Sequence, residues 1–466
     1  MAVLVAQTIG AKRVDADQVS RPNIVVIMAD DLGYAELGSY GQTKIKTPHL
    51  DRMAAEGMRF TQHYTSAPVC APARCSLMTG RHGGHAYVRD NFEVGDWDSY
   101  RGQMPLPSTE RTMAEMLTDH GYCCGAFGKW GLGEVGSDGD PLRHGFARFF
   151  GYNCQRHAHN LFPRYLVDDA GKRMLPGNTR GLTGETYGPA VIADEALKFI
   201  RENHQRPFFV YYPTVIPHLA LQVPESELDQ YRGQWQETPY TGKSYLPHPT
   251  PRAAYAAMIT FMDKQVGRLL SLLKELKIDD NTIVFFTSDN GTTFLKPQVD
   301  YEFFASVGSL RGLKGSVYEG GIRVPMLVRW PGKIKSGAVS DHVCAHYDLL
   351  ATLAELTGST APDNDGLSYL PELLGKSQSK HEALVWDFAG YGGQLAIRQG
   401  DWKAVRRDIK KNAEAPWELY DLKHDPGEQN NVAAMQPDVS SRLQQLMRNS
   451  RTAPQVERFR FGEYPQ

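Results

Sequence analysis

The sequence predicts an α/β fold: a large, mostly parallel sheet with helices on both faces, followed by a smaller C-terminal α+β domain with a short antiparallel sheet. Short apolar runs rich in β-branched and aromatic residues alternate with longer amphipathic segments, which is the pattern of parallel strands joined by helices. After about residue 375 the pattern changes to closely spaced short strands. At 466 residues, the chain is long enough to bury a sizeable core.

The elements of the large domain follow from apolar periodicity and from end signals. Residues 23–29 form a continuous β-branched run that ends in Asp30 and Asp31, as expected of a central parallel strand. Residues 48–56 predict a helix that ends at Gly57. The other predicted helices span 109–120, 189–203 and 251–276, and the other predicted strands span 122–127, 208–212 and 282–287.

Short strands separated by turns mark the C-terminal domain, which follows the Ser- and Lys-rich stretch 375–380. Strands are predicted at 383–388, 394–398, 402–406 and 417–420, and a helix from about Pro437 closes the chain. We therefore divide the chain into an N-terminal segment, an α/β domain and a C-terminal α+β domain, at residues 1–21, 22–375 and 376–466.

Charge and cysteine usage exclude some classes of protein. The chain has 51 basic and 53 acidic side chains, and this formal net charge of −2 lacks the basic surplus of a nucleic-acid-binding protein. The cysteines do not form a spaced disulfide framework. Adjacent Cys123 and Cys124 lie in an apolar run that predicts a buried strand, so the redox compartment stays open.

The N-terminal residues 1–21 allow two interpretations. Residues 2–11 are mildly apolar and too short to span a bilayer, and no basic region precedes them. They indicate either a truncated export signal or a disordered tail that ends at Arg21 and Pro22. The first predicts a periplasmic or secreted protein, and the second leaves a cytoplasmic location open. No later segment is predicted to be a membrane helix.

Oxygen-bearing side chains follow two of the predicted strands. Asp30 and Asp31 end the first strand, and Asp289 and Asn290 follow the strand at 282–287. Because ligands bind beyond the carboxyl ends of parallel strands, both pairs can converge on one cation. A single Asp pair is more often a helix cap or a turn. Together, three carboxylates and an amide carbonyl favour a hard divalent ion, with Ca²⁺ first and Mg²⁺ as the alternative.

Cys70 stands where a polar loop becomes a predicted helix, in the run C-A-P-A-R followed by C-S-L-M-T-G-R. A helix N-terminus offers unpaired N–H groups and the positive end of the helix dipole to an anion. Arg74, one turn further on, adds a positive charge. This placement predicts a nucleophile or its derivative at Cys70, and a buried structural cysteine is the alternative.

The run from Cys70 to Arg81 resembles the signature of the type I sulfatases, a family within the alkaline phosphatase superfamily. The C-x-P-x-R motif of that family marks the cysteine that the cell oxidises to formylglycine. The resemblance therefore implies a modified residue 70 and a formylglycine-generating enzyme as maturation partner. Residues 128–133 and 311–325 resemble two lysine-bearing segments of the same family, and the match spans roughly residues 23–331.

The resemblance also implies roles for individual residues. The implied metal ligands are Asp30, Asp31, Asp289, Asn290 and an oxygen of the formylglycine formed from Cys70. Lys129 and Lys314 would bind sulfate oxygens, and Arg74 would orient the formylglycine hydrate. His218 matches an active-site histidine of the family, so we expect it to contact the ester oxygen and to protonate the leaving alcohol.

The chain departs from the family at Gly131, where a histidine is common. The loop at 155–160 is predicted to supply the missing contact from His157 or His159. The alternative is that both are ordinary loop histidines.

The implied reaction is the hydrolysis of sulfate monoesters. One hydroxyl of the residue-70 hydrate would attack sulfur, and the second would lose its proton and expel sulfate. Residues 85–91, 155–160 and 217–225 are similar to bacterial sulfatases that act on carbohydrates, which predicts a galactose or N-acetylgalactosamine sulfate. Arg89 and Asn91 are candidate sugar contacts, with loop-stabilising hydrogen bonds as the alternative.

Three other functions stay open at this point. A phosphate or phosphonate monoester hydrolase could share the scaffold and the motif. A non-enzymatic protein could bind sulfated glycans with Cys70 unmodified. A thiol enzyme with a Cys–His nucleophile is the third, and it is disfavoured because carboxylate ligands around a hard cation give a thiolate no role.

Overall fold

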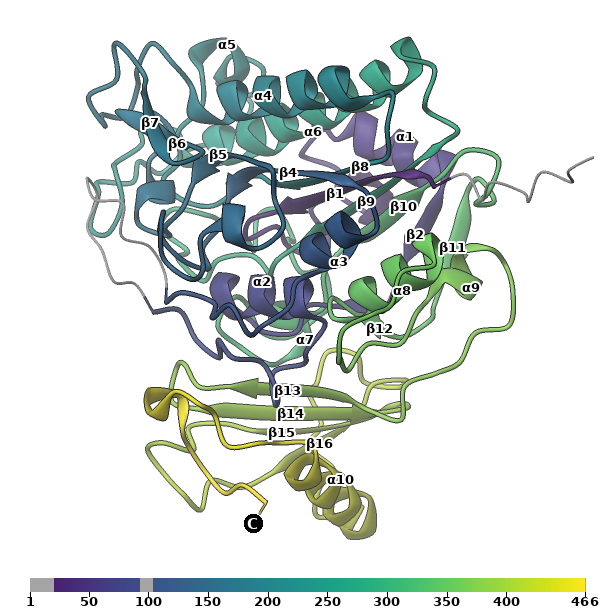
Figure 1. The fold of residues 1–466 in the computed structure, drawn as a ribbon. Coiled ribbons are helices and arrows are strands. Elements are labelled where there is room, and N and C mark those ends of the chain that lie inside the picture. Colours follow the sequence, from purple (N-terminus) through teal and green to yellow (C-terminus); the bar gives the residue numbers. More distant parts are fainter. Residues whose placement is uncertain (1–20, 93–103, 466) are drawn as a thin grey trace, which may run out of the picture.

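The computed structural model describes residues 21–92 and 104–465 and shows a large sheet between two layers of helices, with a smaller sheet beneath them (Figure 1). Ten strands of the described chain form the large sheet. In spatial order they are β11 (Ala338–Ser340), β2 (Met58–Phe60), β10 (Met326–Arg329), β9 (Thr282–Ser288), β1 (Asn23–Ala29), β8 (Phe208–Pro213), β4 (Cys123–Lys129), β5 (Arg148–Tyr152), β6 (Tyr165–Asp168) and β7 (Gly171–Met174).

The centre of the large sheet is parallel, antiparallel pairs flank it on both sides, and the edge strand β11 pairs parallel with β2. Strands β9, β1, β8, β4 and β5 run in one direction, whereas β10 runs against β9, and β6 and β7 form a hairpin beyond β5. A separate two-stranded sheet pairs β3 (His63–Tyr64) with β12 (Cys344–Ala345). All the carboxyl ends of the central strands therefore lie at the same edge.

Helices cover both faces of the large sheet (Figure 1). The upper layer in the view holds α1 (Pro48–Glu56), α4 (Gly188–Asn203), α5 (Glu225–Leu228) and α6 (Pro251–Glu275). The lower layer holds α2 (Cys70–Thr79), α3 (Met113–Asp119), α7 (Glu319–Ile322), α8 (Asp348–Thr357) and α9 (Leu370–Leu373). Short 3₁₀ turns lie at Gly38–Tyr40, Pro141–Arg143, His157–His159 and Glu457–Phe459.

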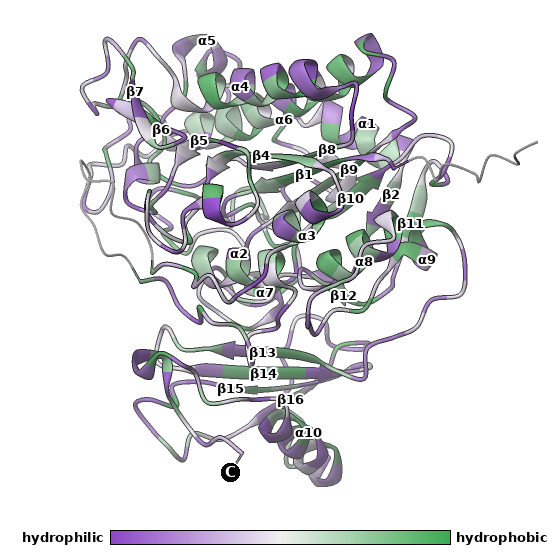
Figure 2. Cartoon of the chain, in the orientation of Figure 1, coloured by the Kyte–Doolittle hydropathy of each residue, from purple (hydrophilic) through white to green (hydrophobic). Residues whose placement is uncertain are grey.

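Strand β1 shows why the sheet must be covered on both sides. Val25 and Ile27 pack into the core beneath α4 and α6, whereas Ile24 and Val26 pack into the core with α2, α3 and α8. Successive side chains of a strand point to opposite faces, so an unbroken apolar run requires apolar partners on both. The hydrophobic colour of the central strands follows this burial (Figure 2).

The C-terminal sheet is antiparallel and contains β13 (Leu384–Phe388), β14 (Gln394–Gln399), β15 (Trp402–Arg406) and β16 (Glu418–Asp421). Helix α10 (Pro437–Asn449) packs on one face through Leu443 and Met447. The other face lies against the large domain, where Trp386 and Phe388 share an apolar cluster with Tyr64. The two domains therefore have a common core.

A buried ion cluster crosses the boundary between the two domains. Lys403 of β15 lies 2.9 Å from a carboxylate oxygen of Glu319 and 2.9 Å from one of Glu428. Glu428 also accepts a hydrogen bond from the backbone N–H of Glu319, at the start of α7. These ion pairs and this hydrogen bond connect the C-terminal domain to the segment that follows Lys314.

The predicted fold class is confirmed, and the differences concern both element ends and elements that were not predicted. Helix α3 begins at Met113 rather than at residue 109, because Thr112 caps it: its side chain accepts from the N–H of Glu115, whose carboxylate accepts in return. The strands and helices that were not predicted are β2, β3, β5, β6, β7, β10, β11 and β12, and α5, α7, α8 and α9. Cys123 and Cys124 do lie in a strand, and all six cysteines are free.

The domain boundaries stay predictions, and residues 1–20 lie outside the described residues. The export signal, the tail and the location therefore stay predictions. Over residues 21–92 and 104–465, every helix is too short or too polar to cross a membrane.

Replacing Lys403 with Met should destabilise the protein by roughly 3–5 kcal/mol, because Glu428 would lose its cation and Glu319 would keep only the more distant Arg323, at 3.5 Å. Burial raises the pKa of Glu428. The Lys403 ammonium lowers the pKa of both carboxyl groups, so its loss raises both folded-state pKa values. A carboxyl group whose folded-state pKa is raised loses stability as pH rises, so the destabilisation should be larger at pH 8 than at pH 5.

Guanidinium unfolding at both pH values measures this difference. Lys423→Met, which removes an exposed lysine of the same domain, is the control. An equal loss in the two variants would contradict the proposed importance of the cluster.

Candidate active site

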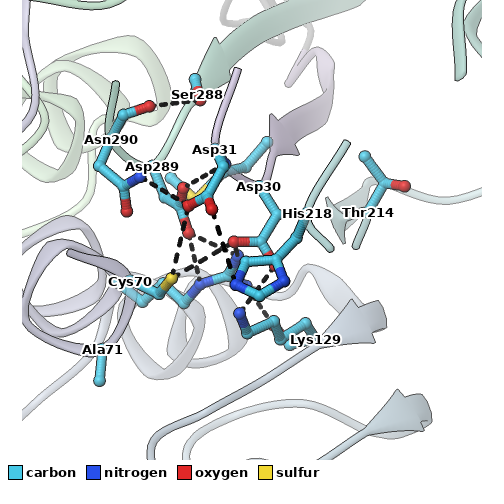
Figure 3. A network of polar contacts seen from close by, with 12 residues as sticks. Asp30, Asp31, Cys70, Ala71, Lys129, Thr214, His218, Ser288, Asp289 and Asn290 are labelled. Carbon is cyan, nitrogen blue, oxygen red and sulfur yellow. Dashed lines mark hydrogen bonds and ion pairs between the residues drawn. The ribbon is translucent and has the colours of Figure 1, made fainter. Parts of the chain in front are cut away.

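Four neighbouring parallel strands deliver polar side chains to one edge of the large sheet. Asp289 and Asn290 follow β9, and Asp30 and Asp31 follow β1. Lys129 is the last residue of β4, and His218 comes five residues after β8. The predicted convergence of the two acidic pairs is therefore seen in the structure, and Figure 3 shows these side chains facing one another.

Cys70 enters this cluster from the N-terminus of α2. Its Sγ lies 3.3 Å from an oxygen of Asp30, and the Nζ of Lys314 lies 3.6 Å from the same sulfur. Burial, with Asp289 and Asp30 close by, raises the pKa of the Cys70 thiol well above its ordinary value. The environment therefore opposes a thiolate, despite the helix N-terminus.

Each carboxylate of the cluster has a cationic partner. Asp30 lies 2.7 Å from the Nζ of Lys129, and Asp31 lies 2.7 Å from the Nζ of Lys314. The guanidinium of Arg74 donates to Asp289 at 2.8 Å and also to the backbone carbonyl of Lys129. These pairs satisfy charges that would otherwise be costly to bury.

The oxygen atoms of the cluster fit a hard divalent cation. The side-chain Oδ1 of Asn290 is buried and has no hydrogen-bond partner, while its Nδ2 donates to Asp31 at 2.7 Å. An orphaned buried carbonyl beside carboxylates is a ready metal ligand. Ligand atoms of Asp30, Asp31, Cys70 and His218 lie within 4.8 Å of one another. Asp31 adopts a left-handed φ of 67°, a backbone conformation that is often found at functional sites.

A cavity of about 140 Å³ opens above Cys70. Its lining consists of Asp31, Cys70, Asn91, Gln155, His159, His218, Leu219, Tyr245, Thr293, Phe294, Leu295, Lys314 and Tyr391. The nucleophile candidate, one lysine and two histidines thus share a single small pocket.

The two histidines of the pocket stack on each other. The rings of His159 and His218 lie 4.9 Å apart and are nearly parallel. The Nδ1 of His218 lies 2.6 Å from the backbone carbonyl of Leu219 and can only donate to it, so Nε2 is the atom that faces Asp31, at 3.6 Å. Burial and the Lys314 ammonium lower the pKa of His218 well below its ordinary value.

The structure separates the two histidines that were predicted to compensate for Gly131. His159 lies in the pocket, whereas His157 is buried between Tyr152 and Tyr165, with its Nε2 3.0 Å from the carbonyl of Tyr165. His157 is absent from the pocket lining, so its predicted substrate contact is not supported by its position.

The two candidate sugar contacts also differ in their placement. Asn91 lines the pocket and accepts a hydrogen bond from the backbone N–H of Ala71 at 2.9 Å. Arg89 does not line the pocket: it is buried and donates to Asp387 and to the carbonyl of Thr452, at 3.1 and 3.0 Å. This geometry favours the alternative of a structural hydrogen-bond group for Arg89, since a guanidinium occupied by the C-terminal domain cannot reach a ligand in the pocket.

Sequence reasoning missed the aromatic residues of the pocket: Tyr245, Phe294 and Tyr391. Phe294 could have been found, because it follows Asn290 by four residues in the loop after β9. Tyr391 lies in the turn between β13 and β14, and no local pattern indicates that this turn reaches the large domain.

His82, His85 and Asp365 form a second group of metal-type side chains. The N–H of Gly84 donates to His82 Nδ1 at 3.1 Å, which leaves the ring proton of the neutral imidazole on Nε2, 3.8 Å from Asp365. Asp365 also lies 2.9 Å from His85 Nδ1. In addition, Asp365 accepts from the backbone N–H of His82 at 3.0 Å, so hydrogen bonds from the His82 N–H and His85 Nδ1 occupy its carboxylate without a metal ion.

Comparison with protein families finds two matches. The family described as "Sulfatase" matches residues 22–359, and "N-sulphoglucosamine sulphohydrolase, C-terminal" matches residues 313–453. Among curated relatives, arylsulfatase A of Bos taurus is 34% identical and covers 92% of this chain and 87% of the relative. N-acetylgalactosamine-6-sulfatase of Canis lupus familiaris is 34% identical and covers 82% and 71%.

Solved structures with the same fold include carbohydrate-bound proteins. Ps i-CgsB in complex with k-i-k-neocarrahexaose has a TM-score of 0.76 at 26% identity and covers 92% of each chain. A phosphonate monoester hydrolase of Agrobacterium radiobacter has a TM-score of 0.65 at 20% identity and covers 91% of this chain and 94% of its own. The second likeness is one of fold alone.

Calcium should stabilise the protein against heat, because a ligand that binds only the folded state adds about 2.7 kcal/mol at a concentration of 100 times its Kd. Asn290→Ala should lower the Ca²⁺ affinity by about tenfold or more and so reduce this stabilisation. The substitution removes the orphaned side-chain carbonyl and leaves every ion pair intact. Thermal unfolding at increasing Ca²⁺ measures both quantities. Asp365→Asn, in the second group, is the matched control, and loss of the calcium effect there but not in Asn290→Ala would contradict the assignment.

Proposed function

Because the chain belongs to the sulfatase family of sulfuric ester hydrolases, we propose that it hydrolyses sulfate monoesters of a carbohydrate. We propose further that residue 70 acts as formylglycine and that Asp30, Asp31, Asp289 and Asn290 hold Ca²⁺, with Mg²⁺ as the alternative ion. The observation that carries the proposal is the position of Cys70 at the base of the small pocket, between Asp30 and the Lys314 ammonium.

Formylglycine at residue 70 would supply a hydroxyl of its hydrate as the nucleophile, and the divalent cation held by Asp30, Asp31, Asp289 and Asn290 would favour the ionised form of that hydroxyl. Lys314 faces the pocket next to residue 70, so its ammonium can bind an ester oxygen. Arg74 donates to Asp289 and to the backbone carbonyl of Lys129. These hydrogen bonds hold α2, and with it residue 70, in a fixed position against the sheet. Lys129 is buried, pairs with Asp30 and does not line the pocket, so we assign it the offset of negative charge beneath residue 70 in place of the sulfate contact that the resemblance implied.

His218 is the candidate proton donor to the leaving alcohol. Its Nδ1 donates to Leu219, so a second proton can enter or leave only at Nε2, the atom on the Asp31 side of the ring. A bound anionic ester would favour the protonated ring, because an opposite charge nearby stabilises imidazolium. His159 stacks behind His218 and holds its ring plane.

Family membership, rather than the charge of the site, favours a sulfate ester over a phosphate ester. The cations Arg74, Lys129 and Lys314 pair one to one with the three carboxylates, so the charges of this cluster cancel. A divalent metal and a protonated His218 would add three positive charges, and an ionised nucleophile together with either ester would balance them to within one charge.

The identity of the sugar rests on weaker support than the ester type. Two of the proteins similar to this chain are an N-acetylgalactosamine-6-sulfatase and a protein solved with a neocarrahexaose. This chain is also similar to an arylsulfatase A, so membership of the family does not by itself identify the alcohol part of the substrate. We propose a galactose or N-acetylgalactosamine sulfate, which suits a pocket lined by polar and aromatic side chains.

Protein expressed with a formylglycine-generating enzyme should hydrolyse the sulfate ester of an alcohol faster than the phosphate ester of the same alcohol. The mass of the peptide that contains residue 70 should be that of the aldehyde or its hydrate, and Cys70→Ala should have no turnover while unfolding at the same temperature. Faster phosphate hydrolysis would favour the phosphate or phosphonate monoester hydrolase. An unmodified thiol together with tight sulfated-sugar binding would favour the non-catalytic protein.

His159→Ala should lower kcat/KM by roughly 10–100-fold, because it removes the ring that supports the proposed general acid. His157→Ala serves as the matched variant, since it removes a buried histidine of the same 3₁₀ turn that does not line the pocket. It should lower the unfolding temperature and leave the kcat/KM of the folded fraction within a few-fold of wild type. Unchanged turnover in both variants would exclude the loop as the replacement for the histidine missing at Gly131.

A further inference from the structure

Two exposed aromatic side chains stand together at the mouth of the pocket. Five large hydrophobic residues are exposed in the described part of the chain, and Phe294 and Tyr391 are two of them, at 44% and 54% exposure. Both line the pocket, and their rings meet edge to face at a centroid distance of 6.1 Å. They come from different domains, so this pairing is created only when the C-terminal sheet is in place.

The backbone of Tyr391 is held in an uncommon conformation. Its φ is 46°, in the left-handed region, and Gly392 and Gly393 follow with positive φ values. Such a conformation costs of order 1–3 kcal/mol in a non-glycine residue and persists where the surroundings impose it. The ring lies on Gly315, where a Cβ would come within 3.3 Å of it, directly after Lys314 in the chain. This backbone conformation places the Tyr391 ring at the pocket mouth, where it stays partly exposed.

The pocket itself is too small for more than part of a substrate. Its volume is about 140 Å³, whereas sites that enclose a drug-sized ligand measure roughly 300–1,000 Å³. A sulfate group and the edge of one sugar ring would fill it. The rest of a longer carbohydrate would have to lie across the rim, where Phe294 and Tyr391 present their exposed surfaces.

We propose that Phe294 and Tyr391 form an aromatic platform that binds the sugar ring next to the sulfated unit, so that the substrate is an oligosaccharide. This inference rests on the proposed function. The C–H face of a pyranose is weakly positive and apolar, and it suits the negative face of an aromatic ring. An uncharged neighbouring ring is expected, because the rim aromatics offer no ion pair.

The test compares substrates of two lengths on matched variants. Phe294→Ala and Tyr391→Ala should each lower kcat/KM for a sulfated galacto-tetrasaccharide by about 3–10-fold more than kcat/KM for the sulfated monosaccharide. Tyr391→Phe keeps the ring and should behave as wild type. Met435→Ala removes another exposed hydrophobic residue that does not line the pocket, and is the control for surface changes.

Binding without turnover separates this inference from the proposed function. Calorimetry of Cys70→Ala with the same two sugars should show tighter binding of the tetrasaccharide, and Phe294→Ala in that background should remove the difference. Hydrolysis of both sugars at equal kcat/KM by wild type would overturn the platform and leave the sulfatase function intact. Absence of hydrolysis, with length-dependent binding that requires Phe294, would overturn the function and keep the platform. Equal losses on both sugars in the alanine variants would overturn the platform as well.

Discussion

Pairing of three carboxylates with three cations at one sheet edge is the constraint on which the rest of this site depends. Burying an isolated charge costs several kcal/mol, so Asp30, Asp31 and Asp289 cannot lie together without compensation. Each cation comes from a different element: Lys129 from β4, Arg74 from α2, and Lys314 from the loop before α7. The acidic edge therefore helps to fix the relative position of three elements that lie far apart in the sequence.

The loop that carries Lys314 needs a second anchor, and the C-terminal domain provides it. The side-chain amide of Gln394, on β14, donates to the carbonyl of Gly315 at 2.7 Å and accepts from the N–H of Val317. Further along, Lys403 binds Glu319 at the start of α7. The small sheet is thus part of the active site, because it holds the backbone that positions one of the three cations.

Sequence patterns predicted what depends on local or periodic signals. The apolar run of β1 predicted a strand buried on both faces, and Asp30 and Asp289 could be paired because parallel strands end at a common edge. The start of α3 was misplaced because the cap at Thr112, and not the apolar pattern, decides where the helix begins. Arg89 and His157 have the same polar, loop-borne appearance as Asn91 and His159, and only tertiary contacts distinguish structural partners from pocket residues.

The environment of Cys70 distinguishes between the chemistries that its sequence motif leaves open. A thiol nucleophile requires a lowered pKa, and the helix N-terminus with its neighbouring cations would supply one if no carboxylate were near. Here burial and two carboxylates raise the pKa of the thiol, so an unmodified Cys70 is held in its least reactive form. The same carboxylates suit an oxygen nucleophile, because a hard cation held by them would acidify a hydroxyl. One arrangement of charge thus disfavours the cysteine as encoded and favours its oxidised, oxygen-bearing derivative at the same position.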